Sequence, residues 1–289
     1  MSATIADYRR FFADEIEACA GLKTAALVEA FATVPRELFL RPGPWVTRSE
    51  ADFAGPPRQT PDADPRRLYH NIVVAIDPAR QLFNGQPSTL GMWIDALALR
   101  RGSRVLHVGA GLGYYTAIIA HVVGSDGRVV AIEVDEALAA DARANLQPLQ
   151  WVDVRCNDAT EPFDETFDAI LVNAGATHPQ HTWLDALGSG GRLVLPLSVP
   201  MSPGAPIGKG IVVLVTNDGD GGEMSARMLT VVMIYSGQGI RDDSMNRKLE
   251  KALMGGLAAF PRLKRLRRDR HDESLSCWMH TDSFCLGWG

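Results

Sequence analysis

The chain has 289 residues, and its 29 Lys and Arg against 34 Asp and Glu give a formal net charge of −5 with His neutral. Apolar residues make up 46% and charged residues 22%, which is usual for a globular protein and excludes disorder of the whole chain. The acidic balance argues against a nucleic-acid partner. Charged residues appear too close to the N-terminus for a secretory signal peptide, and no apolar run approaches the roughly 18 residues of a membrane span. We therefore predict a cytoplasmic protein without a membrane partner.

The first part of the chain shows helical spacing of its apolar residues. Residues 5–20 and 22–33 each repeat apolar side chains at this spacing, and Pro35 lies near the end of the second helix. Residues 41–67 hold six prolines, which indicates an irregular surface segment or lid. Residues 89–99 again show the spacing of a helix.

Strand-like and helix-like runs alternate from residue 104 onward. The strand-like runs are 104–108, 128–133, 152–156, 169–173, 192–196 and 210–216, and the helix-like runs are 114–122, 136–146 and 179–187. This alternation predicts an α/β fold with a parallel sheet covered on both faces. Two strands around a Gly/Asp-rich turn at 217–222 predict a closing antiparallel hairpin, followed by a helix at 244–258 and a short hairpin at 274–288.

A glycine-rich turn follows the first strand of this region. Gly109, Gly111 and Gly113 lie between that strand and the helix that begins at Tyr114. Glycine lets the backbone approach a ligand closely, and a helix N-terminus offers free N–H groups. The spacing departs from the G-x-G-x-x-G of dinucleotide-binding proteins. It fits a nucleoside joined to an amino acid better than a pyrophosphate.

Two acidic residues complete the pattern. Glu133 ends the next strand, 20 residues after Gly113, where a carboxylate can accept hydrogen bonds from both hydroxyls of a ribose. Asp158 and Ala159 follow the strand after that, where a loop can hold the edge of an adenine. In this order and at these spacings, the three elements predict S-adenosylmethionine (SAM) as the cofactor.

Four segments resemble the protein-L-isoaspartate O-methyltransferase family. V-L-H-V-G-A-G-L-G-Y at 105–114, F-D-A-I-L-V-N-A at 167–174, G-G-R-L-V-L-P at 190–196 and V-P-R-E-L-F at 34–39 are similar to its motifs. The resemblance implies a Rossmann-like class I methyltransferase sheet, mostly parallel with a C-terminal antiparallel hairpin. We expect an N-terminal substrate-side segment at 1–88 that includes the lid, a SAM-binding core at 89–239 and a C-terminal extension at 240–289.

The resemblance also implies which residues bind SAM. The family has an acidic residue where His107 stands, so His107 is either a SAM contact or a packed, water-bonded residue of the strand end. The expected cofactor-binding residues are His107, Gly109, Ala110, Gly111, Gly113, Tyr114, Glu133, Val134, Asp158, Ala159 and Asn173.

The segment that precedes the helix at 89–99 departs from the family. The family carries G-Q-T-I-S-x-P here, with its serine beside the methyl donor and the acceptor carboxylate. Aligning the segment on Gln86-Pro87 puts Gly85 at the serine position. Ser88 or Thr89 then supplies a hydroxyl from a shifted position, or Ser88 caps the helix. The candidate catalytic residues are Asn84, Gln86, Ser88 and Asn173.

The expected activity is SAM-dependent O-methylation of a carboxylate, which is already ionised at neutral pH because its reference pKa is roughly 4. The acceptor belongs to a protein, a peptide or a small molecule. Alternatives are a methyltransferase of a small molecule or biosynthetic peptide, and a non-catalytic SAM-binding protein. His178 and His181 are either a general base or solvated loop histidines. Asn173-Ala-Gly-Ala lacks the Pro-Pro-Tyr/Phe of enzymes that methylate a flipped base.

The C-terminal extension carries two further patterns. Six of the nine residues at 262–270 are basic, which indicates either contact with RNA or an acidic partner, or a solvated helix end or strand edge. His271, Cys277, His280 and Cys285 match no zinc spacing, and alternating apolar residues favour a strand hairpin, so we expect no metal site. This hairpin closes the acceptor site or forms a dimer surface, and both monomer and homodimer remain open.

Overall fold

The structure is a computed structural model that describes residues 3–49, 55–219, 223–256 and 262–288. The chain divides into two compact units. Unit 1 contains Met1–Gly102 and Ala110–Cys156, and unit 2 contains Ser103–Gly109 and Asn157–Gly289. Among the described residues, no helix is long and apolar enough to cross a membrane.

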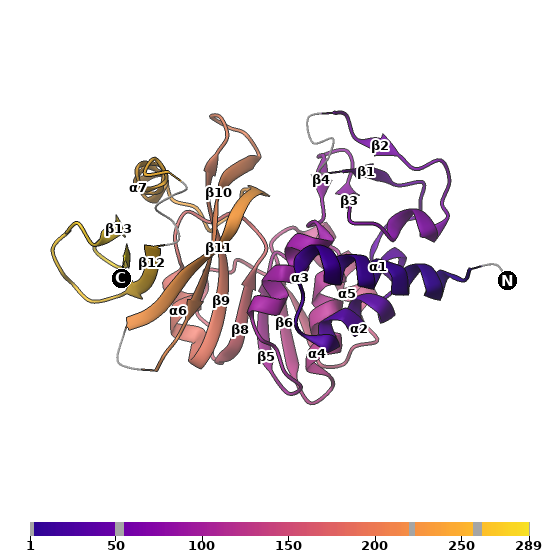
Figure 1. Cartoon of the computed structure of the whole chain (residues 1–289), viewed down its shortest axis with the longest axis horizontal. Helices are drawn as coiled ribbons and strands as arrows, with labels where there is room; N and C mark the ends of the chain where they lie inside the picture. The colour runs from indigo at the N-terminus through magenta and orange to yellow at the C-terminus, as the bar shows by residue number, and fades with distance from the viewer. Residues whose placement is uncertain (1–2, 50–54, 220–222, 257–261, 289) are drawn as a thin grey trace. The chain divides into compact units, whose positions relative to one another are not determined.

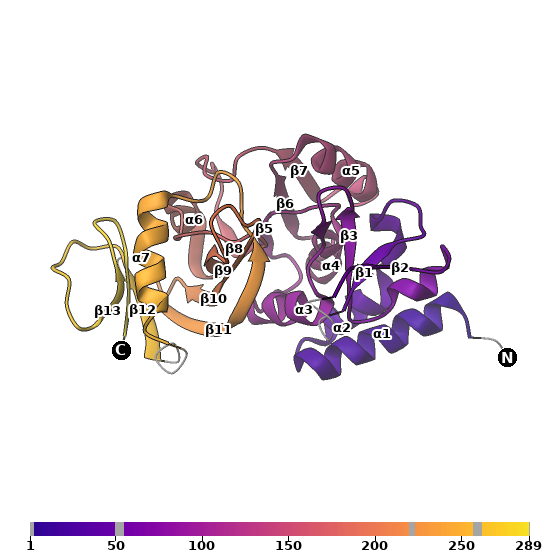
Figure 2. The same ribbon diagram turned by 90° about the horizontal axis from the view of Figure 1, so that it is seen from above.

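Unit 1 contains a group of helices that contact one another: α1 (Ile5–Ala20), α2 (Ala25–Thr33), α3 (Pro87–Ala96) and α4 (Tyr114–Val123) (Figure 2). At the start of α1, the Thr4 hydroxyl accepts from the Asp7 amide while the Asp7 carboxylate accepts from the Thr4 amide. The helix ends at Gly21, whose φ of +62° is left-handed. Phe12 and Phe31 are fully buried between α1 and α2, with ring centroids 6.0 Å apart. The predicted helices are confirmed, with small shifts of their ends.

A small antiparallel sheet also belongs to unit 1 (Figure 1). Its strands β1 (Val46–Arg48), β2 (Arg58–Gln59), β3 (Val73–Asp77) and β4 (Leu82–Phe83) lie in the order β2-β1-β3-β4, and η1 (Arg36–Phe39) and η3 (Pro65–Leu68) are short 3₁₀ helices. Two of these strands fall in the segment 41–67, which we predicted to be irregular. The sequence of that segment does not reveal them, because β1 also pairs with β3 beyond its end. Residues 50–54 of the predicted lid lie outside the described residues.

The remainder of unit 1 is β6 (Arg128–Glu133), α5 (Glu136–Leu146) and β7 (Val152–Cys156). The two strands are parallel, with Val129 opposite Val152. β6 is buried along its whole length after Arg128, as expected for a strand covered on both faces. Asp135 caps α5, because its side chain accepts a hydrogen bond from the Leu138 amide.

Unit 2 is built on a sheet in which β5 (Arg104–Val108), β8 (Phe167–Val172) and β9 (Leu187–Pro200) are parallel neighbours. Helix α6 (His181–Ala186) connects β8 to β9. β9 then pairs antiparallel with β10 (Ile207–Thr216), which pairs with β11 (Glu223–Tyr235). The predicted closing hairpin is therefore confirmed, with longer strands than expected; residues 220–222 of its turn lie outside the described residues.

The C-terminal extension lengthens this antiparallel part of the sheet. It contains α7 (Asp243–Leu253), β12 (Leu263–Arg267), β13 (Cys277–His280) and β14 (Cys285–Trp288). β12 pairs with both β11 and β14, and β13 pairs with β14, so the predicted second hairpin is present. The basic run is largely strand β12, whose Leu263 and Leu266 are buried while Lys264 is exposed. The predicted helix 244–258 ends at Leu253, and its residues 257 and 258 lie outside the described residues.

Candidate active site

The glycine turn has a left-handed backbone at each of its three glycines. The φ angles are +81° at Gly109, +56° at Gly111 and +93° at Gly113, which other residues rarely adopt. A Cβ atom on Gly113 would lie 2.7 Å from the Leu146 Cδ1 atom, so α4 also begins too close to α5 for a larger residue. Both the conformation and the packing therefore require glycine at the position where α4 begins.

Glu133 is held in place by backbone amides in unit 1. Its Oε2 atom accepts from the Gly111 amide at 2.8 Å, and its Oε1 atom accepts from the Asp135 amide at 3.1 Å. Burial raises the pKa of Glu133, and the amide bonds act in the opposite direction. Each carboxylate oxygen has a further lone pair for the hydroxyls of a ligand. The next side chain, Val134, is apolar yet 42% exposed, so it offers an uncovered surface for a ring.

Asp158 lies in unit 2 and is oriented locally. Its Oδ1 atom accepts from the amide and the hydroxyl of Thr160, both at 2.9 Å. Gly239 closely approaches this carboxylate, because a Cβ atom there would lie 2.5 Å from Oδ2. The sequence analysis missed Gly239, and only its φ of +76° and this contact reveal why it is glycine. The carbonyl of Ala159 accepts from the Trp183 indole at 2.7 Å, which fixes the following loop.

Asn173 follows β8, also in unit 2. Its amide donates to the Val108 carbonyl at 2.8 Å, and its side-chain nitrogen lies 3.5 Å from the Gly109 carbonyl oxygen. The backbone thus continues the pairing of β5 with β8 beyond the end of the strand. Because the side-chain contact is long, the Asn173 carboxamide keeps most of its hydrogen-bonding capacity for a ligand.

Two of the expected cofactor residues are deeply buried. His107 in unit 2 is 0% exposed, and burial lowers its pKa to about 4, so its ring is neutral near pH 7. It therefore does not reproduce the charge of the acidic residue that the family has at this position. In unit 1, Tyr114 packs against Phe39 and Tyr115, and burial raises its pKa. Their burial places both side chains in the cores of their units.

Ser88 forms a reciprocal pair with Asn71, a residue that the sequence analysis missed. The Asn71 side-chain nitrogen donates to the Ser88 hydroxyl oxygen at 2.9 Å, and the Ser88 amide donates to the Asn71 side-chain oxygen at 3.0 Å. Ser88 does not cap α3: the N-cap residue is Gln86, which makes no side-chain cap bond, and Asn71 supplies the cap. The Gln86 side chain donates to the Asn71 carbonyl at 3.2 Å. No local pattern links Asn71 to a helix that begins 16 residues later.

The positions before Ser88 have structural duties of their own. The Asn84 side-chain oxygen accepts from the Val74 amide at 2.8 Å, which extends the pairing of β3 with β4. The Gly85 carbonyl accepts from the Tyr115 hydroxyl. A Cβ atom on Gly85 would lie 2.2 Å from the Leu90 Cδ2 atom. The family's serine thus cannot occupy position 85 while Leu90 keeps its place.

Arg36 explains the V-P-R-E-L-F motif structurally. Its guanidinium is fully buried and donates to the carbonyls of Leu68, His70 and Ile72 at 2.7, 3.2 and 2.7 Å. These carbonyls flank Asn71 on both sides. Arg36 therefore fixes the backbone of the segment whose Asn71 side chain holds Ser88, which makes it a positioning residue.

The two candidate bases differ in their surroundings. The ring nitrogens of His178 lie 2.9 Å from the Thr177 hydroxyl and 3.3 Å from the Gln180 side-chain nitrogen, and burial lowers its pKa. Its ring also stacks on Phe284, with centroids 6.3 Å apart. These contacts favour a packing role for His178. His181 is exposed at the start of α6.

Comparison with known proteins places this arrangement in a family. The profile of the Protein-L-isoaspartate(D-aspartate) O-methyltransferase (PCMT) family matches residues 59–203, half of the chain. A protein-L-isoaspartate O-methyltransferase of Methylorubrum populi is 36% identical over 183 residues, which cover 62% of this chain and 74% of the relative. The chain belongs to this family. A Thermotoga maritima relative of the same name is 28% identical, and the match covers 62% of this chain and 53% of the relative.

A solved structure agrees with this assignment at the level of the fold. A protein-L-isoaspartate O-methyltransferase aligns with a TM-score of 0.65 and 23% identity, over 84% of this chain and 69% of the other. The predicted class I α/β fold, the O-methyltransferase activity and SAM as the cofactor are thereby confirmed for this member of the PCMT family. The roles of the individual site residues stay predictions.

Proposed function

We propose that this PCMT-family enzyme methylates the carboxylate of an isoaspartyl residue in a protein or peptide. The Asn71–Ser88 pair carries the proposal. The Ser88 oxygen accepts from Asn71, so the hydroxyl proton is left to donate to an acceptor carboxylate. The neighbouring Asn84 and Gln86 side chains are also uncharged. Such groups suit an acceptor that is already ionised and needs no general base.

SAM supplies an electrophilic methyl group on its sulfonium. The proposed cofactor residues of unit 1 are Glu133, which accepts from ribose hydroxyls, and Val134, which covers one face of the adenine. Those of unit 2 are Asp158, at the adenine edge, and Asn173. Glycine at 109, 111 and 113 lets the backbone approach the ligand closely, while Ala110 and Ala159 add small side chains. His107 contributes only a neutral, buried ring.

The protein's main contribution is then positional. Ser88 directs one carboxylate oxygen, Asn71 fixes Ser88, and Arg36 fixes the backbone around Asn71. Holding the acceptor in attacking geometry removes the entropy cost of bringing acceptor and methyl donor together from solution. A change that displaces Ser88, Asn71 or the backbone that Arg36 holds should therefore lower turnover more than it lowers affinity for SAM.

A second candidate is the carboxylate of a small molecule or of a particular biosynthetic peptide. The observation that favours it is Gly85, which stands where the family has its serine and which the Leu90 side chain keeps small. A changed acceptor segment with an unchanged glycine turn is consistent with the same donor and a different acceptor.

The test uses methyl-labelled SAM with an isoaspartyl peptide and its normal aspartyl twin. We expect base-labile label on the isoaspartyl peptide alone. Ser88→Ala should lower kcat/KM about 100-fold, as for loss of one donor to the reacting group. Thr89→Ala is the matched control and should stay within a few-fold of the wild type. Label on neither peptide, in a protein that binds SAM by equilibrium dialysis, would reject isoaspartate and favour the second candidate.

A further inference from the structure

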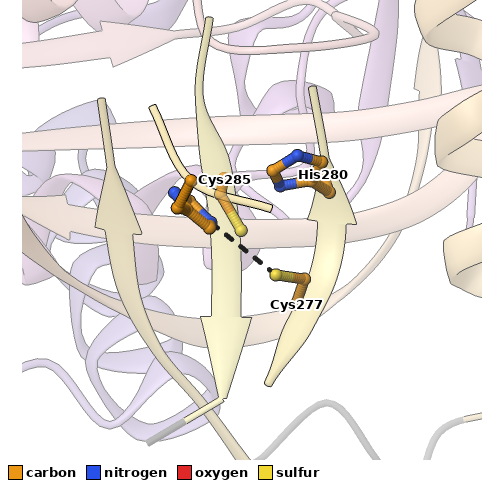
Figure 3. A group of neighbouring side chains, drawn as sticks. Cys277, His280 and Cys285 are labelled. Atoms are coloured by element: carbon orange, nitrogen blue, oxygen red, sulfur yellow. Dashed lines mark hydrogen bonds between the residues drawn. The ribbon is translucent and has the colours of Figure 1, made fainter. Parts of the chain in front are cut away.

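The C-terminal strands of unit 2 bring together four side chains that are common metal ligands. His271, Cys277, His280 and Cys285 each offer one ligand atom, and these four atoms all lie within 4.8 Å of one another. Figure 3 shows Cys277, His280 and Cys285 pointing toward one another from β13 and β14. Their spacing gave us no reason to expect a metal site, and strand pairing rather than spacing brings them together.

The pairing accounts for the cluster residue by residue. His280 lies directly opposite Cys285 in the β13–β14 pair. Cys277 and His280 are three residues apart, which would place them on opposite faces of a regular strand. The register shifts between Cys277 and Met279, and such an irregularity returns Cys277 to the face of His280. His271 arrives from the preceding loop, and its ring lies 4.8 Å from that of His280 between centroids.

We propose that these four side chains bind one zinc ion as a structural site of the C-terminal extension. Zinc takes four N and S ligands in a tetrahedron, at about 2.3 Å to sulfur and about 2.0–2.1 Å to nitrogen. Ligand atoms in such a site are about 3.3–3.8 Å apart, as follows from those bond lengths. Cys277 Sγ and His271 Nε2 are already 3.7 Å apart. The remaining pairs, none beyond 4.8 Å, need only a small contraction around the ion.

The two histidines have the surroundings of metal ligands. The His271 Nδ1 atom lies 3.2 Å from the Asp269 carbonyl oxygen and 3.6 Å from an oxygen of its carboxylate, which leaves Nε2 directed at Cys277. Zinc-bound histidines are usually oriented by such a second contact. The His280 Nδ1 atom is buried and has no hydrogen-bond partner among the residues that the structure describes. A buried polar atom of this kind requires a partner, and a metal ion supplies one.

Charge favours a divalent cation in the same place. Cys277 and Cys285 would both bind zinc as thiolates, because the deprotonated sulfur is the form that ligates a metal. Two thiolates so close repel each other, whereas a Zn²⁺ ion neutralises both. Four protein ligands leave no open position, so the site is structural rather than catalytic.

The ion would stabilise contacts that reach beyond the hairpin. Phe284, next to the ligand Cys285, stacks on His178 in the loop after β8. On the other strand, the Trp278 indole, between two ligands, donates to the Ala252 carbonyl of α7 at 3.0 Å. Zinc bound by four residues from one loop and two strands would hold these contacts together, so its loss should loosen the extension.

The decisive experiment measures zinc in the full chain, purified without a histidine tag under reducing conditions. We expect about one zinc ion per chain in the wild type, by analogy with four-ligand sites. A Cys277→Ser/Cys285→Ser double variant should retain less than a tenth of this. Cys19→Ser/Cys156→Ser, which replaces the two exposed cysteines of unit 1, is the matched control and should bind as the wild type does. Co²⁺ in place of zinc should give tetrahedral and thiolate charge-transfer absorption bands in the wild type and the control only.

Two direct measurements on the wild type would each overturn the proposal, and a third, on its Tm and Co²⁺ spectrum, serves if the double variant fails to fold. One is wild type that, after incubation with zinc, holds no more metal than the double variant. The other is a Cys277–Cys285 disulfide, found by mass spectrometry in protein kept reduced throughout. A double variant that fails to fold does not remove the test, because a chelator should lower the Tm of the wild type by several degrees and added zinc should restore it. An unchanged Tm, together with no Co²⁺ spectrum, would contradict a structural zinc site.

Discussion

Replacing Gly85 by serine, the residue that the family carries at the aligned position, should destabilise the enzyme rather than improve it. The added Cβ atom would lie 2.2 Å from Leu90 Cδ2 and 2.8 Å from Cγ, whereas carbon atoms in contact are about 3.5–4.0 Å apart. Leu90 is only 2% exposed, so it has little room to move away. Overpacking of this kind costs about 1–3 kcal/mol. Strain on the hydrogen bond from Tyr115 to the Gly85 carbonyl adds to it.

The assay is urea unfolding of the wild type, Gly85→Ser, Leu90→Ala and the double variant. Leu90→Ala alone should cost about 2–5 kcal/mol, because it leaves a cavity in the core. In the double variant the serine occupies part of that cavity, so the total loss should be smaller than the sum by about 1 kcal/mol or more. Gly85→Ala should reproduce the effect of serine, since the Cβ atom causes the clash. Losses that add within about 0.5 kcal/mol would refute the reasoning.

Two other side chains give predictions of the same kind. Burial lowers the pKa of His107 from 6.5 to about 4. As the pH falls, His107 is therefore protonated in the unfolded chain before it is protonated in the folded one. The free energy of unfolding should therefore fall as the pH drops from about 6.5 to about 4, by up to about 3 kcal/mol. His107→Gln should lack this part of the pH dependence, and identical pH profiles of the urea midpoint would contradict it. Arg36→Met leaves three carbonyls without their donor and should cost about 3 kcal/mol or more, with Arg36→Lys between it and the wild type; a loss below about 1 kcal/mol would contradict the positioning role.

The elements that could be predicted closely are those with local signals. α1 has a capping box at Thr4 and a glycine at its end, and α5 begins after the cap Asp135, so both match their predicted bounds. The strands β5, β6 and β7 also match: β5 and β6 are largely apolar and buried, and β7 alternates Val and Cys with Asp and Arg. β1 and β2 have no such mark. Their partners are chosen by the register of the small sheet rather than by neighbouring residues.

The predicted site divides in the same way. The glycine turn and Glu133 belong to one strand–turn–helix–strand motif, so their order and spacing in the sequence predict the site. Asn71 acts on Ser88 through two hydrogen bonds, whereas Leu90 and Gly239 act on Gly85 and Asp158 through close packing. Neither kind of interaction leaves a periodic pattern or a motif in the sequence. A resemblance could indicate that position 85 differs from the family, but only the packing explains why it is glycine.

The four proposed zinc ligands of the C-terminal extension show which kind of metal site a rule based on sequence spacing can exclude. Spacings of two to four residues are typical of zinc ligands that share one turn. The gaps from Cys277 to His280 and from His280 to Cys285 hold two and four residues and fall within that range, but the five residues between His271 and Cys277 do not. A site built across paired strands obeys a different rule, in which register decides proximity. A two-residue turn at Thr281-Asp282 would put His280 opposite Ser283, whereas the observed pairing puts it opposite Cys285. What the sequence does not reveal is the irregularity before Met279, and without it Cys277 would point to the other face.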